Sequence, residues 1–309
     1  MVLGNTLNNA TKSMSSLRPS FLPEMDLHCP TSLDELFGHM DDGAQLLSGG
    51  TDILLQAGQT GSPDHLVWTG GINALKEFVT EGDRLKIGAS VPLSQMIKSQ
   101  SFRKAAPAVN DGASVVGSTQ LRRQATMVGN VCTASPAADT VPGLLVHDCV
   151  VEIKTVDGKS RSVDLKYFIT GPGKTTLAEG ELVTSLSLTP LGQNQTSAYQ
   201  RFTYRKALDL AFACVAARLD YEEDHETIKS VQLALGAVGP TVIDASSIAD
   251  VLIGQPLDNI QLGKCAEVAS ELCTPISDHR ASADYRRQLI KALVGDVILQ
   301  AANRLKGSS

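Results

Sequence analysis

The chain lacks several features that would assign it quickly to a class. Its 309 residues include six cysteines, but none forms a CxxC pair or lies with histidines at a zinc spacing. A zinc site is therefore excluded, and reduced thiols in a cytoplasmic protein are the simpler interpretation. No apolar run approaches the ~18 residues that a membrane helix needs, so no membrane span is expected. The 27 basic and 33 acidic residues form no long block of one sign, which argues against nucleic acid as a partner.

Recognisable catalytic motifs are also absent. The segment GPGKTTL, residues 171–177, looks like a phosphate-binding P-loop, but the motif requires glycine where the chain has Phe168. We interpret it as a turn that presents Lys174 to solvent or to a partner subunit. No GxGxxG follows a strand, so a doubly wound dinucleotide fold has no support. The six histidines are scattered and no Ser/His/Asp or Cys/His set stands out, which leaves a bound cofactor as the expected source of chemistry.

Short strands and short helices alternate along the chain, which predicts an α+β fold. Residues 1–20 lack the apolar core of a signal peptide and are expected to form a disordered extension. The segment 31–40 carries Thr31 or Ser32 as a possible helix cap with Glu35 at capping-box spacing. Apolar segments at 44–50 and 65–71 predict strands, and turns at 81–83 and 157–158 predict hairpins. Beyond a linker-like stretch at 189–200, two antiparallel strands over 211–221 and 228–239 precede a helical remainder.

Two glycine-containing segments are the best candidates for a binding site. The segments SGGTD at 48–52 and TMVGN at 126–130 combine glycine with neighbouring hydroxyl or amide groups. Glycine adopts φ > 0 freely and lacks a Cβ, so backbone N–H groups can converge there on a pyrophosphate without a nearby Lys or Arg. The pair Gly49–Gly50 is equally compatible with an ordinary turn. Asp139 is compatible with a helix N-cap or with hydrogen bonds to ribose or ribityl hydroxyls.

Four segments together resemble one known family. They are LLSGGTDILLQ, STQLRRQATMVGNVCTASPAADTVPGLL, YRKALDLAFACVAARL and ISDHRASADYRRQLIKALV, and they span the chain from about residue 21 to 305. Their content and order are similar to those of the FAD-binding medium subunit of the molybdenum hydroxylases, the xanthine dehydrogenase and aerobic carbon monoxide dehydrogenase family. The resemblance implies an α+β fold: a two-lobed FAD-binding domain, then a domain with a three-stranded antiparallel sheet and a helical bundle. The implied boundaries are 21–80 for the first lobe, 81–192 for the second and 193–306 for the C-terminal domain.

The resemblance also implies a set of FAD-binding residues. The first glycine loop would wrap the pyrophosphate, the second would complete that grip, and Asp139 would contact the FAD hydroxyls. A hydrophobic contact near the flavin falls on Val116 and Gly117, and a basic residue near the ring falls on Arg201, with Lys206 as the second choice. The two glycine loops contribute Leu46, Leu47, Ser48, Gly49, Gly50, Thr51, Asp52, Ile53, Thr126, Val128, Gly129 and Asn130.

The implied function is electron transfer within a larger complex. A large subunit would carry the molybdopterin cofactor, a small subunit would carry two [2Fe-2S] clusters, and FAD on this chain would deliver electrons to an external acceptor. The implied assembly is a dimer of heterotrimers, and the alternatives are a free-standing FAD oxidoreductase and a scaffold subunit without FAD. The sequence departs from the family at Val128, where most members have the first glycine of a pair. No cysteine-bearing insertion for an additional cluster is present.

Overall fold

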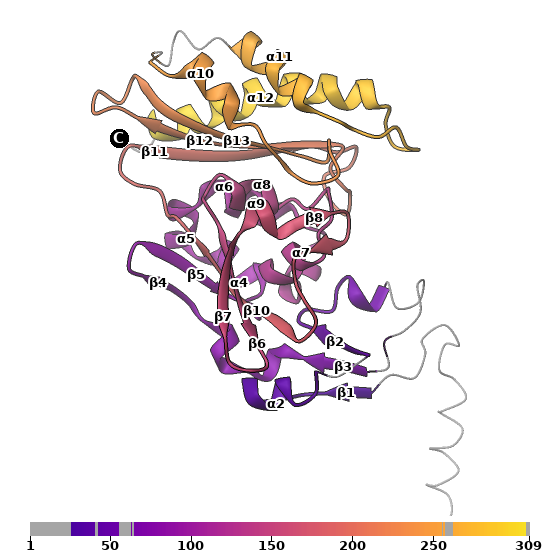
Figure 1. Cartoon of the computed structure of the whole chain (residues 1–309). Helices are drawn as coiled ribbons and strands as arrows, with labels where there is room; N and C mark the ends of the chain where they lie inside the picture. The colour runs from indigo at the N-terminus through magenta and orange to yellow at the C-terminus, as the bar shows by residue number, and fades with distance from the viewer. Residues whose placement is uncertain are drawn as a thin grey trace, which may run out of the picture.

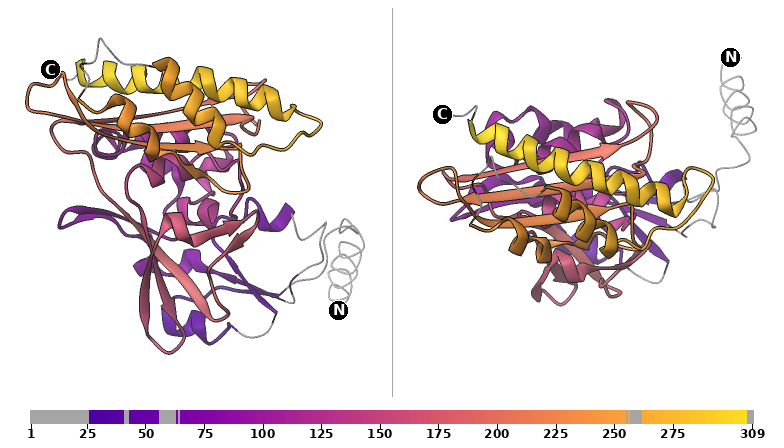
Figure 2. Two further views of the ribbon diagram at one scale, coloured as in Figure 1. Left: turned by 45° about the horizontal axis from the view of Figure 1, so that its top comes forward. Right: turned by 90° about the horizontal axis from the view of Figure 1, so that it is seen from above.

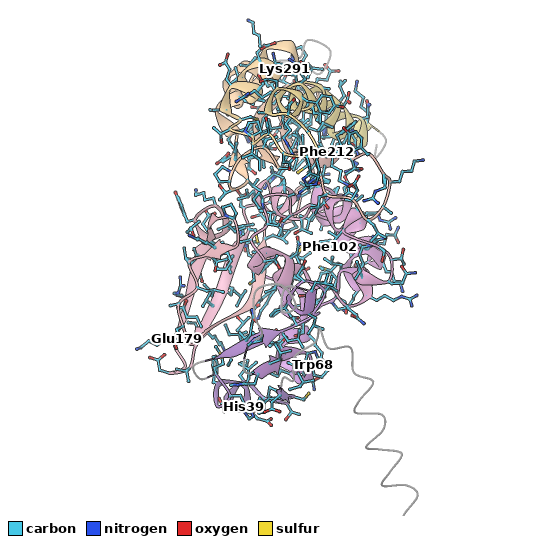
Figure 3. The ribbon with its side chains drawn as sticks, turned by 90° about the vertical axis from the view of Figure 1, so that its right-hand side faces the viewer. His39, Trp68, Phe102, Glu179, Phe212 and Lys291 are labelled. Atoms are coloured by element: carbon cyan, nitrogen blue, oxygen red, sulfur yellow. The ribbon has the colours of Figure 1, made fainter. Side chains whose placement is uncertain are left out.

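A computed structural model describes residues 26–40, 43–55, 63, 65–254, 256 and 262–306. The predicted extension at 1–20 lies outside these residues. The described chain forms three larger sheets in succession, packed with helices, and a small two-stranded sheet (Figure 1). In two further views the C-terminal helices lie across one face of the last sheet (Figure 2). His39, near the first sheet, and Lys291, on the C-terminal helices, lie near opposite ends of the described structure (Figure 3).

The first lobe is a small parallel sheet, which has the order β1-β3-β2. Its strands are β1 (Asp26–His28), β2 (Ala44–Leu47) and β3 (His65–Trp68), with helix α2 (Leu33–Phe37) between the first two. The Ser32 hydroxyl accepts a hydrogen bond from the Glu35 amide, which confirms Ser32 as the helix cap. Strand β2 ends directly before Ser48, so the sheet delivers the first glycine loop at its edge.

The second lobe is an antiparallel sheet with the order β4-β5-β10-β6-β7. Strands β4 (Phe78–Glu81) and β5 (Arg84–Gly88) form the first predicted hairpin, and β6 (Val150–Thr155) and β7 (Ser160–Asp164) form the second. Strand β10 (Glu181–Leu188) lies between these hairpins and pairs with both. Within the segment 171–177, residues 172–173 form the turn between strands β8 (Ile169–Gly171) and β9 (Lys174–Thr175). Lys174 is exposed, which agrees with the interpretation of this segment as a turn.

Short helices pack on the second lobe and carry the residues that join it to the next domain. They are α4 (Leu93–Lys98), α5 (Gln100–Ala105), α6 (Pro107–Val115), α7 (Met127–Cys132), α8 (Val141–Leu145) and α9 (Leu165–Phe168). One hydrophobic core spans both lobes, from Leu36 and Val67 in the first to Phe102 and Leu186 in the second. The two lobes therefore share a core, although their sheets are separate.

The C-terminal domain has four antiparallel strands, one more than the resemblance implies. The three long strands are β11 (Gln195–Phe202), β12 (Ala213–Tyr221) and β13 (Ile228–Gly236), and the fourth is the two-residue β14 (Ile243–Asp244). Strand β14 exists because the chain turns back after Pro240 and pairs with β13 before the helices begin. Strand β11 starts at Gln195, so the linker-like polar residues 195–200 are in fact strand.

Helices cover both faces of this sheet. Helix α12 (Ala283–Lys306) contacts β11 and β12, α11 (Leu262–Leu272) contacts α12, and α10 (Ala249–Leu252) contacts β13 (Figure 1). On the other face, α6 contacts β11 and α8 contacts β13. Eight of the nine residues of β12 are buried because both faces are covered.

Buried polar contacts join the second lobe to the C-terminal domain. The imidazole of His147 lies between the carbonyl of Thr189, 2.8 Å from Nδ1, and the hydroxyl of Ser197, 3.0 Å from Nε2. A carbonyl only accepts, so Nδ1 carries the proton and Nε2 accepts from Ser197.

Within the C-terminal domain, Arg286 donates to the carbonyl of Phe212 at 2.7 Å and pairs with Asp278 at 3.0 Å. Asp278 and Arg286 therefore support the end of the connection that leads from β11 into β12.

Candidate cofactor site

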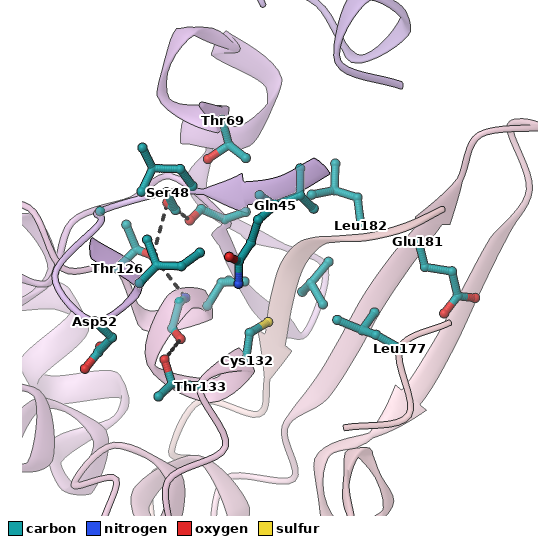
Figure 4. A pocket seen from close by; sticks show the side chains of 18 of the residues that line it. Gln45, Ser48, Asp52, Thr69, Thr126, Cys132, Thr133, Leu177, Glu181 and Leu182 are labelled. Atoms are coloured by element: carbon teal, nitrogen blue, oxygen red, sulfur yellow. Dashed lines mark hydrogen bonds between the residues drawn. The ribbon is translucent and has the colours of Figure 1, made fainter. Parts of the chain in front are cut away.

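A cavity of about 530 Å³ lies between the first and second lobes (Figure 4). Its volume is within the range of small-molecule and cofactor sites. The first glycine loop forms one wall and helix α7 forms another, while the segment before and at the start of β10 closes a third side. Eleven of the predicted residues line it: Leu46, Leu47, Ser48, Gly49, Gly50, Thr51, Asp52, Ile53, Thr126, Val128 and Gly129. We call this space the interlobe cavity.

The two glycines of the first loop are required for different reasons. A Cβ built on Gly49 would lie 2.2 Å from the carbonyl oxygen of Gln124 and 2.9 Å from the Cα of Ala125. Both are backbone atoms of the second lobe, so only glycine allows this approach. Gly50 instead has φ +70, with room limited only by the side chains of Leu47 and Leu54. Gly50 therefore supplies a left-handed turn, whereas Gly49 lets the two lobes meet.

The second predicted loop is the start of helix α7, and here the sequence interpretation is wrong. The Thr126 hydroxyl accepts a hydrogen bond from the Gly129 amide at 3.0 Å and so caps the helix. Gly129 does not adopt positive φ. It must be small because a Cβ there would lie 2.9 Å from the Thr126 hydroxyl oxygen. Val128 needs no glycine-like freedom either, because it is an ordinary buried helix residue.

Hydroxyls connect the two walls of the cavity. Thr126 Oγ1 donates to Ser48 Oγ at 3.3 Å, and Ser48 Oγ donates to the Ala89 carbonyl at 3.0 Å. Within the described ranges, the amide N–H groups of residues 49–52 donate no hydrogen bond to the backbone. These amides and hydroxyls are the donors that a bound pyrophosphate accepts from.

The charge of the lining is acidic. Among the described residues that line the cavity there is no Lys or Arg, whereas Asp52, Glu179 and Glu181 are present. Arg161 neutralises Glu181 through two hydrogen bonds of 2.7 and 2.6 Å. Partial loss of solvent raises the pKa of the Asp52 carboxyl. The donor set fits a phosphate group held by backbone and hydroxyl donors, and it does not fit one held by an ion pair.

Six predicted residues do not line the cavity, and two of them form a buried ion pair. Asp139 Oδ2 lies 2.7 Å from Arg201 NH1, with side chains 8% and 7% exposed, and Asp139 Oδ1 accepts from the Tyr199 hydroxyl at 2.6 Å. Burial raises the pKa of the Asp139 carboxyl, and Arg201 and Tyr199 offset part of that rise. Asp139 is not a helix cap, because Thr140 is the N-cap of α8. Asn130 accepts from the Thr140 hydroxyl at 2.6 Å.

The remaining three residues are Val116, Gly117 and Lys206. Gly117 contacts the turn between β11 and β12 (residues 203–210), and this turn carries Lys206. The Leu208 amide donates to the Gly117 carbonyl at 3.3 Å, and both residues have positive φ. Arg201 NH1 also donates to the Asp209 carbonyl at 3.3 Å, so the buried pair holds the base of this turn. Lys206 is exposed at its tip and forms no ion pair with the described residues. Val116 precedes Gly117 and is partly buried.

Sequence reasoning missed about half of the cavity wall. Gln45 gave no signal because a polar residue within a short strand is ordinary, and Cys132 gave none because its helix was taken for a loop. Burial raises the pKa of the Cys132 thiol to about 12, so this thiol stays protonated. The other unpredicted lining residues are Met40, Ala44, Thr69, Ala89, Thr133, Gly173, Leu177, Ala178, Glu179, Gly180, Glu181, Leu182 and Val183.

Two other site classes find no support in the described residues. No group of three or more His, Cys, Asp or Glu side chains there is arranged to hold a metal ion. Among the described helices, none has the length and apolar character to cross a membrane.

Two family models match successive parts of the chain. Residues 23–190 match the family described as the FAD binding domain in molybdopterin dehydrogenase, and residues 197–301 match the CO dehydrogenase flavoprotein C-terminal domain. The xanthine dehydrogenase FAD-binding subunit of Escherichia coli O157:H7 is 29% identical over 84% of this chain and 88% of its own length. The carbon monoxide dehydrogenase medium chain of Hydrogenophaga pseudoflava is 25% identical over 91% of this chain and 96% of its own. Quinoline 2-oxidoreductase from Pseudomonas putida 86 superimposes with a TM-score of 0.86 at 26% identity, covering 92% and 99% of the two chains.

Proposed function

The chain belongs to the family of the FAD binding domain in molybdopterin dehydrogenases, and we propose that it relays electrons through FAD within a heterotrimeric molybdenum hydroxylase. It is an FAD-binding medium subunit of the molybdenum hydroxylase family of oxidoreductases. In the proposed route, electrons pass from two [2Fe-2S] clusters of a small subunit through this chain to an external acceptor. A large subunit with the molybdopterin cofactor oxidises the substrate.

One observation carries the proposal: the interlobe cavity offers backbone and hydroxyl donors but no reactive side chain. FAD, when bound, supplies chemistry that no side chain lining the cavity offers, because it exchanges electrons singly with iron–sulfur clusters and in pairs with other acceptors. The chain's own residues bind and orient. Residues 48–53 and Thr126 would hold the pyrophosphate, and Gly49 would keep the two walls close enough to share it.

We further propose that the flavin ring lies outside the cavity, beside Val116–Gly117 and the turn at 203–210. The hydrogen bond from Leu208 to Gly117 supports this, because it brings the turn that carries Lys206 next to Gly117, an expected ring contact. Arg201 is committed to Asp139, whereas Lys206 is exposed. We therefore assign the role of the basic residue near the ring to Lys206. Asp139 and Arg201 would act by holding the turn in place.

We propose that the complete assembly is a dimer of heterotrimers in the cytoplasm. All six cysteines are free, which is typical of a reducing compartment.

Purification of the chain from its native source tests the proposal. We expect a flavin absorbance band together with co-purifying larger and smaller chains that contain molybdenum and iron. A colourless preparation would favour the scaffold alternative. A yellow monomer that oxidises a substrate without partners would favour the free-standing oxidoreductase.

A further inference from the structure

Gln45 is an exposed polar side chain that lines the interlobe cavity. It lies on β2, and its amide points into the cavity toward Cys132 (Figure 4). The side chain forms no hydrogen bond with any described residue, although the neighbouring hydroxyls of Ser48 and Thr126 are both engaged. A free carboxamide offers one acceptor and two donors in a single plane. Such a group is suited to the edge of a planar, hydrogen-bonding ring.

The lining of the cavity divides into two ends of different chemistry. One end consists of the glycine loop and the start of α7, with their N–H and hydroxyl donors. The other end carries Gln45 with Cys132, Leu177 and Leu182, and Glu181, which is paired with Arg161, lies beyond them (Figure 4). No aromatic residue lines the cavity within the part of the chain that the structure describes. The cavity is therefore matched to a ligand with an anionic end and a flat, largely apolar end that has one polar edge.

The adenosine diphosphate half of FAD has this division of properties. The flavin ring must stay accessible to electron donors and acceptors, whereas the adenine ring takes no part in the reaction and can be enclosed between the lobes. We propose that Gln45 recognises the adenine edge of FAD and so determines selection of an adenine dinucleotide. This inference rests on the proposed function, because it concerns the cofactor of the same site. In the proposed pairing, the Gln45 amide oxygen accepts from the adenine amino group and its NH₂ donates to N7, an edge at which the hypoxanthine ring offers two acceptors and no donor.

Nucleotide binding to the full chain, stripped of FAD, tests this assignment. Titration calorimetry compares ADP with inosine diphosphate, whose ring carries an oxygen in place of the amino group. Because one hydrogen bond contributes about 1 kcal/mol, the wild-type chain should bind ADP about fivefold more tightly than inosine diphosphate. Gln45→Leu should weaken binding of ADP and FAD by about the same factor and leave FMN binding unchanged.

The matched control is Gln95→Leu, since Gln95 is an exposed glutamine on α4 outside the cavity. It should leave every affinity unchanged. Equal binding of ADP and inosine diphosphate by the wild-type chain overturns the assignment without reference to any variant. Unchanged FAD and ADP binding by Gln45→Leu also overturns it, as does an equal loss of FMN, which would place the amide beside the flavin half. A wild-type chain that takes up no FAD overturns the proposed function itself.

Discussion

Replacing Gly49 by alanine tests the geometry on which the site depends. The new Cβ would lie 2.2 Å from the Gln124 carbonyl oxygen, 2.7 Å from its carbon and 2.9 Å from the Ala125 Cα. Ordinary contacts of this kind begin near 3.4 Å, so the backbone of one wall must move. Overpacking of this kind costs about 1 to 3 kcal/mol. If the glycine loop yields, FAD affinity should fall by about 5- to 150-fold.

Two other glycines separate this effect from backbone strain. Gly50 and Gly82 have φ of +70 and +62, and the Cβ of an alanine at Gly82 would meet nothing within 4 Å. Alanine at either position should cost about 1 to 2 kcal/mol of stability through its left-handed backbone. Gly82 does not line the cavity, so the Gly82→Ala variant should lose stability and keep its affinity for FAD.

FAD titration of each stripped variant, with urea unfolding in parallel, measures both quantities. The expected ranking in FAD affinity is wild type and Gly82→Ala together, then Gly50→Ala, then Gly49→Ala. A Gly49→Ala chain with wild-type FAD affinity and wild-type stability would refute the claim that the two walls meet at this position.

Three further predictions concern buried and exposed charges. Burial lowers the pKa of His147 to about 4, so the stability from its neutral form is complete above about pH 6.5 and is lost as the pH falls toward 4. The loss should reach on the order of 3 kcal/mol in unfolding titrations, and a His147→Gln chain with the same pH dependence would contradict this origin. Asp139→Ala and Arg201→Ala should each cost about 3 to 5 kcal/mol because each leaves a buried partner without its counter-charge, whereas losses below 1 kcal/mol in urea would show that the pair is not critical. Lys206→Gln should lower the flavin midpoint potential by about 20 mV, since a cation near the reduced ring contributes about 1 kcal/mol in water. Arg201→Lys, which keeps the charge, should shift it less, and an unchanged potential in Lys206→Gln would remove the role assigned to that residue.

The elements with strong local signals were predictable. The hairpins at 82 and 158 follow from glycine turns between apolar strands, and both glycines adopt positive φ. The cap of α2 follows from Ser32 and its spacing to Glu35. Strand β14 was not predictable, because two residues carry no periodicity and its pairing depends on β13 already being in place.

The site was predictable where a motif has a local cause. The glycine loop was identified because Gly49 and Gly50 are unusual in an apolar context, yet the need for Gly49 depends on Gln124, distant in sequence. Helix α7 was taken for a loop because its small and polar residues have weak helix propensity, and the Thr126 cap outweighs that weakness. The pairing of Asp139 with Arg201 joins segments 62 residues apart, which local pattern does not reveal.

The central claim is that electrons leave the complex through FAD on this chain, and removal of FAD from the purified complex tests it most directly. The iron–sulfur clusters are reduced with dithionite, excess reductant is removed, and an external acceptor is added while the cluster signal is followed by electron paramagnetic resonance. The account predicts that the clusters of the stripped complex stay reduced and that added FAD restores their reoxidation. Reoxidation at the same rate with and without FAD would contradict it.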